Sequence, residues 1–494
     1  MTRRTGQWLM GLVVLGLVLR VVAWGFKGGF HYPDEIFQQL EPAHYLRTGI
    51  GWLPWEFDRG LRPWIMPWIY TGLMEALSWV GVVGHQALRA VNLHNALWTA
   101  AMIPAGFRIG RALGHGAPGD EHGERAGLLT AALTAAWPIL LYFSPHALMG
   151  TPSMVCLSFG YANWLETRLG GEGAQRAGFG MGLWFGLAGM VRFTSGLHML
   201  LPLAEMLVAR RWKPIGAMAL GALPGIGLLA LVDAVTWGRP FHSAIEHFTY
   251  NYIEGKASHH GTSPWEFYLV DTIIARLGPL APISALLVLL GGRRSWPAIL
   301  TAAAPTILLS TVPHKEERFL MHSWPMWVAS ISMGLWQLER LMAPKTERRA
   351  DDDKGDASPA AAASGLAKAA PWVTAAVALA VVGSCVYGAS QMKWRWRAGL
   401  FEAQAWVGAQ PDATGLLFDD RQHLNGGHLT LNKAIPQIKN SPKWWRHPLF
   451  NYAALKDDDP HVARLMRARW EVVQRFEGIT VLRRMEHKKS RKNP

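Results

Sequence analysis

The chain has 494 residues, of which half are hydrophobic and 17% are charged, and its formal net charge is +14 at pH 7. This length exceeds that of one ordinary domain. The basic residues do not gather on one surface but fall mostly in short loops between apolar segments. That distribution indicates membrane topology and excludes a nucleic-acid-binding surface.

Apolar segments of roughly 20 residues, the length that crosses a bilayer, follow one another as far as residue 390. We expect about 11 transmembrane helices, near 8–26, 86–107, 126–143, 153–168, 177–191, 196–209, 214–236, 267–290, 296–312, 321–341 and 371–390. The predicted fold is therefore mainly α and polytopic. Cys156 and Cys385 both lie in apolar segments, so we expect from them neither a disulfide nor a metal site.

The charge distribution sets the expected orientation. The first apolar segment follows Arg3 and Arg4 and is not followed by a small-residue cleavage site, so we expect an uncleaved span with a cytoplasmic N-terminus. Segment 62–82 is ambiguous, because as a full span it would place the basic loop at 108–125 outside. Treated as a half-embedded juxtamembrane piece, it leaves the basic loops on the cytoplasmic side.

The chain divides into four expected parts. A transmembrane module at 1–342 is followed by a polar, low-complexity cytoplasmic linker at 343–370. The last transmembrane helix, 371–390, leads to a small extracytoplasmic α/β domain at 391–494. In this topology the first loop, 27–85, is also extracytoplasmic and carries juxtamembrane helices.

The first loop holds the densest polar pattern. Asp34 and Glu35 follow a proline that suits the first position of a helix, where the helix dipole favours carboxylates. At helical spacing, Asp34, Gln38 and Glu41 share one face. We expect an amphipathic helix on the membrane surface, which Pro42 bends or ends. The alternative is an N-terminal cap with a solvated face.

Two further stretches, one in the same loop and one at 250–268, carry aromatic residues among polar ones. Trp55, Glu56 and Arg62 suit a sugar, whose apolar face stacks on rings while its hydroxyls bond to carboxylates. An interfacial aromatic belt is the alternative. His259 and His260 invite a metal site, but the sequence shows no established spacing for three or four convergent ligands, so we expect no metal.

A third group is basic. His314, Lys315 and Arg318 lie together between two apolar segments, and Arg192 stands at the outer end of another. Such cations can hold a phosphate, with arginine as a bidentate fork. Snorkelling and ion pairing within the loop are the alternatives. Outside the cytoplasm a nucleotide-activated donor is not normally available, whereas a lipid phosphate that carries a sugar is.

Five motifs, in order, resemble those of glycosyltransferase family 22, which contains GPI-anchor mannosyltransferases and the lumenal α-mannosyltransferases of N-glycan assembly. They are Pro-Asp-Glu…Gln…Glu…His at 33–44, Trp-Glu…Gly-Leu-Arg…Pro at 55–67, Met-Val-Arg-Phe-Thr at 190–194, Tyr…His-Gly-Thr-Ser-Pro-Trp…Tyr at 252–268, and Pro-His-Lys-Glu-Glu-Arg-Phe-Leu at 313–320. His260 and Ser263 depart from the family's pattern, which leaves the acceptor open.

The resemblance implies a multi-span GT-C fold and an inverting transfer of mannose, or a related hexose, from a polyprenyl- or dolichyl-phosphate donor to a glycan or glycolipid. It needs no cofactor. Asp34 carries over as the general base, with Glu35 as the neighbouring candidate. Arg192, His314, Lys315 and Arg318 carry over as donor-phosphate contacts. The expected sugar and acceptor contacts are His31, Gln38, Glu41, His44, Trp55, Glu56, Arg62, His259, His260 and Trp265.

A lipid-linked sugar or polysaccharide transporter without chemistry is the main alternative. It would explain many spans and polar loops, but we would expect its ionisable groups deeper in the spans. The expected location is a bacterial inner membrane with the site facing the periplasm, or the ER membrane facing the lumen in a eukaryote. The acceptor, the linkage and the oligomeric state stay open.

Overall fold

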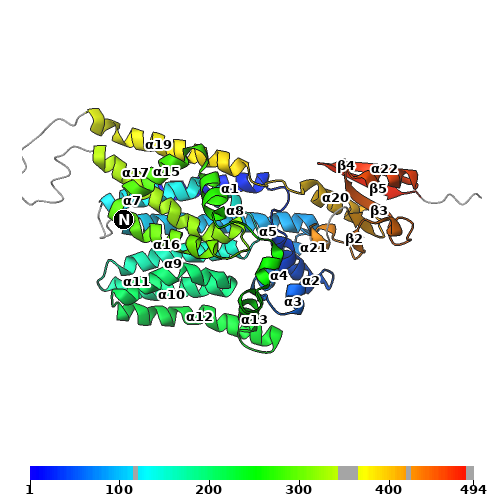
Figure 1. The fold of residues 1–494 in the computed structure, drawn as a ribbon, viewed down its shortest axis with the longest axis horizontal. Coiled ribbons are helices and arrows are strands. Elements are labelled where there is room, and N and C mark those ends of the chain that lie inside the picture. The colour runs from blue at the N-terminus through cyan, green and yellow to red at the C-terminus, as the bar shows by residue number, and fades with distance from the viewer. Residues whose placement is uncertain (115–120, 343–364, 419–423, 486–494) are drawn as a thin grey trace, which may run out of the picture. The chain divides into compact units, whose positions relative to one another are not determined.

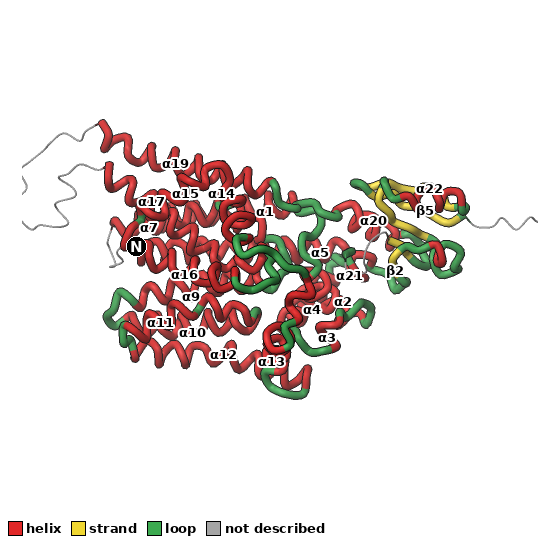
Figure 2. The backbone as a smooth tube through the Cα atoms, viewed as in Figure 1, coloured by secondary structure: helices red, strands yellow, loops and turns green. Residues whose placement is uncertain are grey.

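The computed structural model describes residues 1–114, 121–342, 365–418 and 424–485 (Figure 1). It is mainly helical, and the strands of these described residues all lie in the C-terminal segment (Figure 2). The chain forms two compact units. The helical unit comprises Met1–Trp24 with Asn95–Met392, and the mixed unit comprises Gly25–His94 with Lys393–Pro494.

The longer elements of the helical unit follow the expected apolar segments, with differences at prolines and polar ends. They are α1 (Arg3–Phe26), α6 (Met102–Gly114), α7 (Glu121–Ala136), α8 (Pro138–Phe143), α9 (Gly150–Thr167), α10 (Gly173–Val191), α11 (Leu200–Val208), α12 (Trp212–Trp237), α15 (Ala281–Leu290), α16 (Gly292–Ser310), α17 (Trp324–Met342) and α19 (Gly365–Ser390).

Short elements join them and form the loops. They are η2 (Thr99–Ala101), η3 (Phe193–His198), α13 (His242–Phe248), η4 (Thr249–Ile253), η5 (Lys256–His260), η6 (Tyr268–Ile274), α14 (Ala275–Leu277), η7 (Gly278–Leu280) and η8 (Glu317–Ser323). The segment expected as one span at 126–143 is divided between α7 and α8, because Pro138 cannot donate to the preceding turn and begins a new helix.

Four helices within the described residues are long and apolar enough to cross a membrane: Arg3–Phe26, Trp212–Trp237, Tyr268–Leu290 and Ala369–Ser390. The protein is thus an integral membrane protein, and the full number of spans stays a prediction. Residues 343–364 of the expected linker lie outside the described residues, and its last part, 365–370, belongs to α19.

Helices α10 and α12 lie side by side along much of their length (Figure 1). Their contact is built on glycines: a methyl group at Gly182 or Gly178 of α10 would overlap the backbone of α12, and one at Gly221 or Gly225 of α12 would overlap that of α10. Small residues at this spacing let two membrane helices approach closely. The pair forms one wall of the helical unit.

The mixed unit joins the first loop to the C-terminal segment. Its loop elements are the π-helical turn η1 (Glu35–Leu40), α2 (Glu41–Thr48), α3 (Trp55–Asp58), α4 (Ile65–Ser78) and α5 (Gly84–Trp98), whose last residues belong to the helical unit. Its C-terminal elements are α20 (Ala398–Ala409), β1 (Leu416–Phe418), α21 (Gly427–Leu431), β2 (Gln437–Lys439), η9 (Pro442–Trp444), β3 (Tyr452–Lys456), α22 (Pro460–Arg467), β4 (Trp470–Phe476) and β5 (Ile479–Arg484).

The strands form a sheet in the order β2-β1-β3-β5-β4. β1 is parallel to both β2 and β3, whereas the β4–β5 hairpin is antiparallel and β5 pairs with β3. Apolar residues of α20, such as Leu400 and Val407, pack with Leu416 and Val481 of the sheet. β1, α22 and the β4–β5 hairpin lie close to a strand-like run at 415–420, a helix-like run at 461–469 and a hairpin-like pattern at 469–483 in the sequence, whereas β2 and β3 were not predicted.

Direct backbone contacts hold the first loop to the C-terminal segment. The amides of Gly28 and Phe30 donate to the carbonyls of Trp394 and Trp396, each at 3.2 Å. A side chain at Gly29 would overlap the Trp396 carbonyl. The first loop, expected to belong to the module at 1–342, groups in the structure with residues after 392.

Pro42 does not end the first-loop helix. It stands in the first turn of α2, directly after the π-helical turn η1. A proline is tolerated there because the first amides of a helix have no partner within it. The expectation of a surface-lying helix also changes, since every residue from Glu35 to His44 is buried.

Candidate functional site

Asp34 begins the π-helical turn of the first loop. It is half-buried, and its side chain makes no capping hydrogen bond to the turn that follows. The cap that the sequence left open as an alternative is thus not formed in this structure. A partly exposed carboxylate at the start of a helical segment is suited to accept a proton from a neighbouring hydroxyl.

Glu35 is engaged differently from its neighbour. Its carboxylate is 1% exposed and lies 3.1 Å from the amine of Lys27, which is 3% exposed. It also accepts a hydrogen bond from the amide of His31 at 3.2 Å, and the Lys27 amine donates to the carbonyl of Gly29. Burial lowers the pKa of Lys27, and the charge of Glu35 opposes that shift. Lys27, which directly follows the first apolar segment, was not among the residues expected at the site.

Three of the expected sugar contacts meet in the loop. The side-chain amide of Gln38 donates to Glu56 at 3.1 Å, and Arg62 approaches the same carboxylate oxygen at 3.9 Å. Trp55 is 42% exposed beside Glu56, and the His31 ring stacks on Tyr32 with centroids 4.1 Å apart. An exposed indole next to a carboxylate and an amide is an arrangement that can contact a sugar.

Glu41 and His44, also expected as acceptor contacts, are both buried. The Glu41 carboxylate is fully enclosed and accepts hydrogen bonds from Trp52 and from residues of the C-terminal segment. Burial lowers the pKa of His44 to about 4, so its imidazole is neutral at neutral pH. Their roles as sugar contacts stay predictions. In the structure both side chains lie in the protein interior, where Glu41 links two segments by hydrogen bonds.

The basic loop of the helical unit is tied together by Glu316. His314 Nε2 lies 3.1 Å from one of its oxygens, and Arg318 Nε donates to the other at 2.5 Å. Burial alone would raise the pKa of Glu316, but the charge of Arg318 and the bonds from both cations hold it well below its usual range. The hydrogen bond to Glu316 raises the pKa of His314 in turn.

Arg192 joins this group through an aromatic ring. The guanidinium groups of Arg192 and Arg318 each lie 5.5 Å from the centroid of Phe319. Arg192 also donates to Thr194 at 2.9 Å. The structure therefore brings the expected phosphate contacts of two distant motifs together, and it adds Phe319, which sequence reasoning had quoted in the motif without giving it a role.

The segment after η5 supports the basic loop through its backbone. The carbonyl of Gly261 meets His314 Nδ1 at 3.0 Å, and that of Ser263 accepts from the Lys315 amine at 2.9 Å. His259 is exposed and Trp265 is 72% exposed, while the side chain of His260 lies outside the described part. Within the described residues, no group of three His, Cys, Asp or Glu side chains could hold a metal ion.

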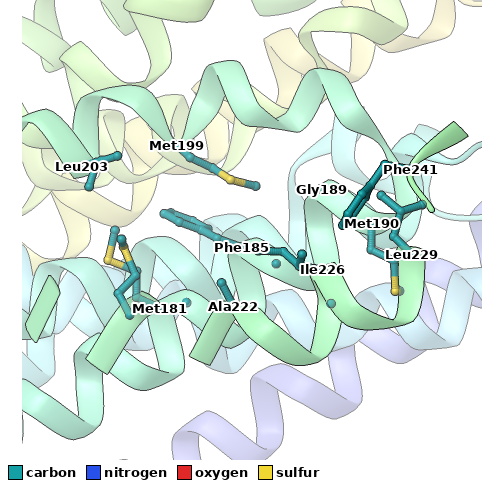
Figure 3. Close-up of a pocket in the computed structure, with 14 residues that line it drawn as sticks. Met181, Phe185, Gly189, Met190, Met199, Leu203, Ala222, Ile226, Leu229 and Phe241 are labelled. Carbon is teal, nitrogen blue, oxygen red and sulfur yellow. The ribbon is translucent and has the colours of Figure 1, made fainter. Parts of the chain in front are cut away.

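An apolar cavity of about 280 Å³ lies within the helical unit (Figure 3). Its walls come from α10, α12 and the residues around α11, and they include Met181, Phe185, Met190, Met199, Leu203, Ala222, Ile226, Leu229 and Phe241. Met190 precedes Arg192 by two residues, so one wall leads along α10 toward the cluster of Arg192, His314 and Arg318. Such a cavity suits an apolar chain.

Comparison with known proteins places this chain among mannosyltransferases. It is 26% identical to GPI mannosyltransferase 3 of Yarrowia lipolytica over 304 residues, which are 59% of this chain and 55% of the relative. It is 22% identical to the protein of the same name from Saccharomyces cerevisiae over 400 residues, covering 66% and 64% of the two chains. The chain spans little more than half the length of several such relatives.

Among solved structures, ArnT from Cupriavidus metallidurans bound to undecaprenyl phosphate has a TM-score of 0.60 at 14% identity, over 96% of this chain and 98% of that one. This likeness shows the GT-C fold that the sequence predicts. The model of the Alg9-like mannosyltransferase family matches residues 12–392, well over half of the sequence. The chain therefore belongs to the Alg9-like mannosyltransferase family.

Proposed function

We propose that this protein is an inverting glycosyltransferase that moves mannose, or a related hexose, from a polyprenyl- or dolichyl-phosphate donor to a hydroxyl of a glycan or glycolipid. The observation that carries the proposal is the contrast between two adjacent acids. Glu35 is buried against Lys27, whereas Asp34, directly before η1, is half-buried and reaches solvent. Asp34 is thus the acid better placed to serve as the general base.

The reaction assigns a separate task to each group. Asp34 takes the proton of the acceptor hydroxyl, whose oxygen forms the new bond to the anomeric carbon. The bond from that carbon to the donor phosphate breaks, and its electron pair leaves with the phosphate. Arg192, Lys315 and Arg318 stabilise the charge that develops there, an effect that grows toward the transition state.

The named relatives support this donor. One of them, from Schizosaccharomyces pombe, is named a probable Dol-P-Man:Man(7)GlcNAc(2)-PP-Dol alpha-1,6-mannosyltransferase and is 29% identical over 153 residues. The apolar cavity beside Met190 is suited to part of the donor's isoprenoid chain, because its walls carry no charged side chain. We further infer that the reaction takes place on the extracytoplasmic side of the membrane.

The test uses the purified full-length protein with dolichyl phosphate mannose that carries labelled mannose. Synthetic alkyl glycosides ending in α-mannose serve as acceptors. Asp34→Asn keeps the shape of the side chain and removes the base, so transfer should fall about 10²–10⁴-fold. The matched control is Asp58→Asn, an exposed acid of the same loop, which should transfer normally.

Two outcomes would overturn the proposal. Near-normal transfer by Asp34→Asn would remove Asp34 from the mechanism. Wild-type protein that binds the labelled donor and carries it across vesicle membranes, but never transfers its sugar, would indicate the transporter instead.

A further inference from the structure

Glu41 is the point at which the C-terminal segment is attached to the helical turns that carry Asp34. One oxygen of its fully buried carboxylate accepts from the amide of His428 at 2.8 Å and meets His428 Nδ1 at 3.0 Å. The other accepts from the amide of Leu429 at 3.0 Å. The amide of Trp52, in the first loop, also donates to the carboxylate, at 3.1 Å. All these residues belong to the mixed unit.

A buried polar network fixes the C-terminal side of this contact. The side chain of Gln404, on α20, bonds to Gln437 on β2 at 2.7 Å and accepts from the amide of Gly426 at 2.8 Å. Asn425 accepts from the amide of Gly427 at 2.8 Å. Hydrogen bonds thus run from the sheet to α21, whose first amides point at Glu41.

Gly427 is required by two separate constraints. Its φ of +65° lies in the left-handed region that favours glycine. A methyl group on it would overlap an oxygen of the Glu41 carboxylate. The first loop and the C-terminal segment are therefore in contact without room for one additional carbon atom.

We propose that the C-terminal segment is a working part of the transferase, and that Glu41 and His428 are positioning residues that set the orientation of Asp34. Glu41 begins α2 directly after η1, so a displacement of its carboxylate is transmitted along one continuous helical stretch to Asp34. This inference rests on the proposed function of Asp34. It extends beyond the family match, which ends at residue 392, before the segment that supplies His428.

The alternative is that the contact only stabilises the fold. The two readings differ in what a small displacement does. If the contact is purely structural, disturbing it lowers the amount of folded protein and leaves each folded molecule fully active. If the contact positions Asp34, disturbing it lowers the turnover of folded molecules, because a displacement of about 1 Å near a reacting group can cost on the order of 10²-fold in rate.

Gly427→Ala and Gly478→Ala make a matched pair in the full-length protein. Gly478 has a φ of +66° in the β4–β5 turn, so both substitutions introduce similar backbone strain, but a methyl group at Gly478 meets nothing within 4 Å. Transfer is measured with dolichyl phosphate mannose and the alkyl mannoside acceptors, and the results are normalised to folded protein by gel filtration and thermal melting.

We expect Gly427→Ala to lower kcat at least tenfold with the KM for the donor unchanged, while Gly478→Ala keeps the wild-type kcat. Adding Glu41→Asp to Gly427→Ala withdraws the carboxylate from the new methyl group and should restore part of kcat. Equal kcat values in the two alanine variants, or a loss that only tracks the unfolded fraction, would overturn the inference.

A second variant keeps the inference testable if Gly427→Ala does not fold. Glu41→Gln keeps the size of the side chain but turns an acceptor oxygen into a donor that faces amide N–H groups. It should lower kcat in the same selective way, and an unchanged kcat would overturn the inference. Wild-type protein without any transfer would instead refute the proposed function, so the two failures are distinguishable.

Discussion

At the scale of single residues, the adjacent acids of the first loop differ because one has a buried partner. Lys27 and Glu35 are both almost fully enclosed and 3.1 Å apart. A buried pair of this kind contributes little net stability, but removing one partner leaves an uncompensated charge. Glu35 is therefore held in a buried ion pair, whereas the side chain of Asp34 is partly exposed.

The first prediction concerns this pair. Glu35→Gln should destabilise the protein by about 3–5 kcal/mol, because it leaves the Lys27 ammonium buried without its counter-charge. Lys27→Met combined with Glu35→Gln should recover most of that loss. Thermal melting in detergent measures the stabilities, and transfer per folded molecule should stay within a fewfold of wild type in both variants. A folded, stable Glu35→Gln protein without transfer would make Glu35 the base.

The basic loop supports a prediction on pH. The hydrogen bond to Glu316 raises the pKa of His314 above its ordinary value of 6.5. A raised pKa means that the protonated form is favoured in the folded protein, so its stabilising effect is complete below pH 6.5 and is lost as pH rises through the folded value. The groups facing His314 are Glu316, Arg318 and the Gly261 carbonyl.

We therefore expect the melting temperature of the wild-type protein to fall as pH rises above 6.5, over the range in which His314 loses its proton. His314→Gln keeps a hydrogen-bonding side chain that does not titrate, so this fall should be smaller in the variant. Differential scanning fluorimetry across pH 5.5–9 makes the comparison, with His259→Gln, an exposed histidine of the same unit, as the control. Parallel curves for wild type and His314→Gln would contradict the assignment.

At the scale of elements, periodicity and proline positions predicted most helices but not their interruptions. The strand at 416–418, the helix near 461 and the hairpin after 469 were visible as local patterns. The π-helical turn at η1 was not, because a change to i→i+5 hydrogen bonding leaves no mark in residue type. Gln38 and Glu41, which the helical count had placed on one face with Asp34, are both buried.

The packing of α10 on α12 gives the third prediction. Gly182→Ala places a methyl group against the Met218 carbonyl, so the helices must separate. Overpacking of this kind costs typically about 1–3 kcal/mol. Gly216→Ala, on α12, meets nothing within 4 Å and serves as the control. Thermal melting in detergent should show a lower melting temperature for Gly182→Ala but not for Gly216→Ala. Equal melting temperatures for the two variants would mean that the two helices are not in close contact.

At the scale of the whole molecule, the sequence predicted local clusters of polar residues better than it predicted which distant segments meet. The aromatic and acidic loop at 55–62 and the basic loop at 314–318 were recognised from composition, and each forms a cluster in the structure. The attachment of the first loop to residues after 392 was not foreseeable, because it depends on Gly29 and Gly427 meeting partners hundreds of positions away. A single sequence contains no record of such pairs.

The last prediction concerns orientation across the membrane. Arg210, Arg211 and Lys213 lie at one end of α12, and Arg293 and Arg294 lie near the start of α16. Basic residues at the ends of spans favour the cytoplasm. Reporter fusions after Lys213 and after Arg294 should both report the cytoplasm, whereas a fusion after Pro494 should report the opposite side. The pair of internal fusions controls for expression, because they are expected to agree. If the Pro494 fusion also reports the cytoplasm, the mixed unit cannot meet a sugar donor displayed on the outer leaflet. The first loop and the C-terminal segment that binds Glu41 would then need a cytoplasmic substrate.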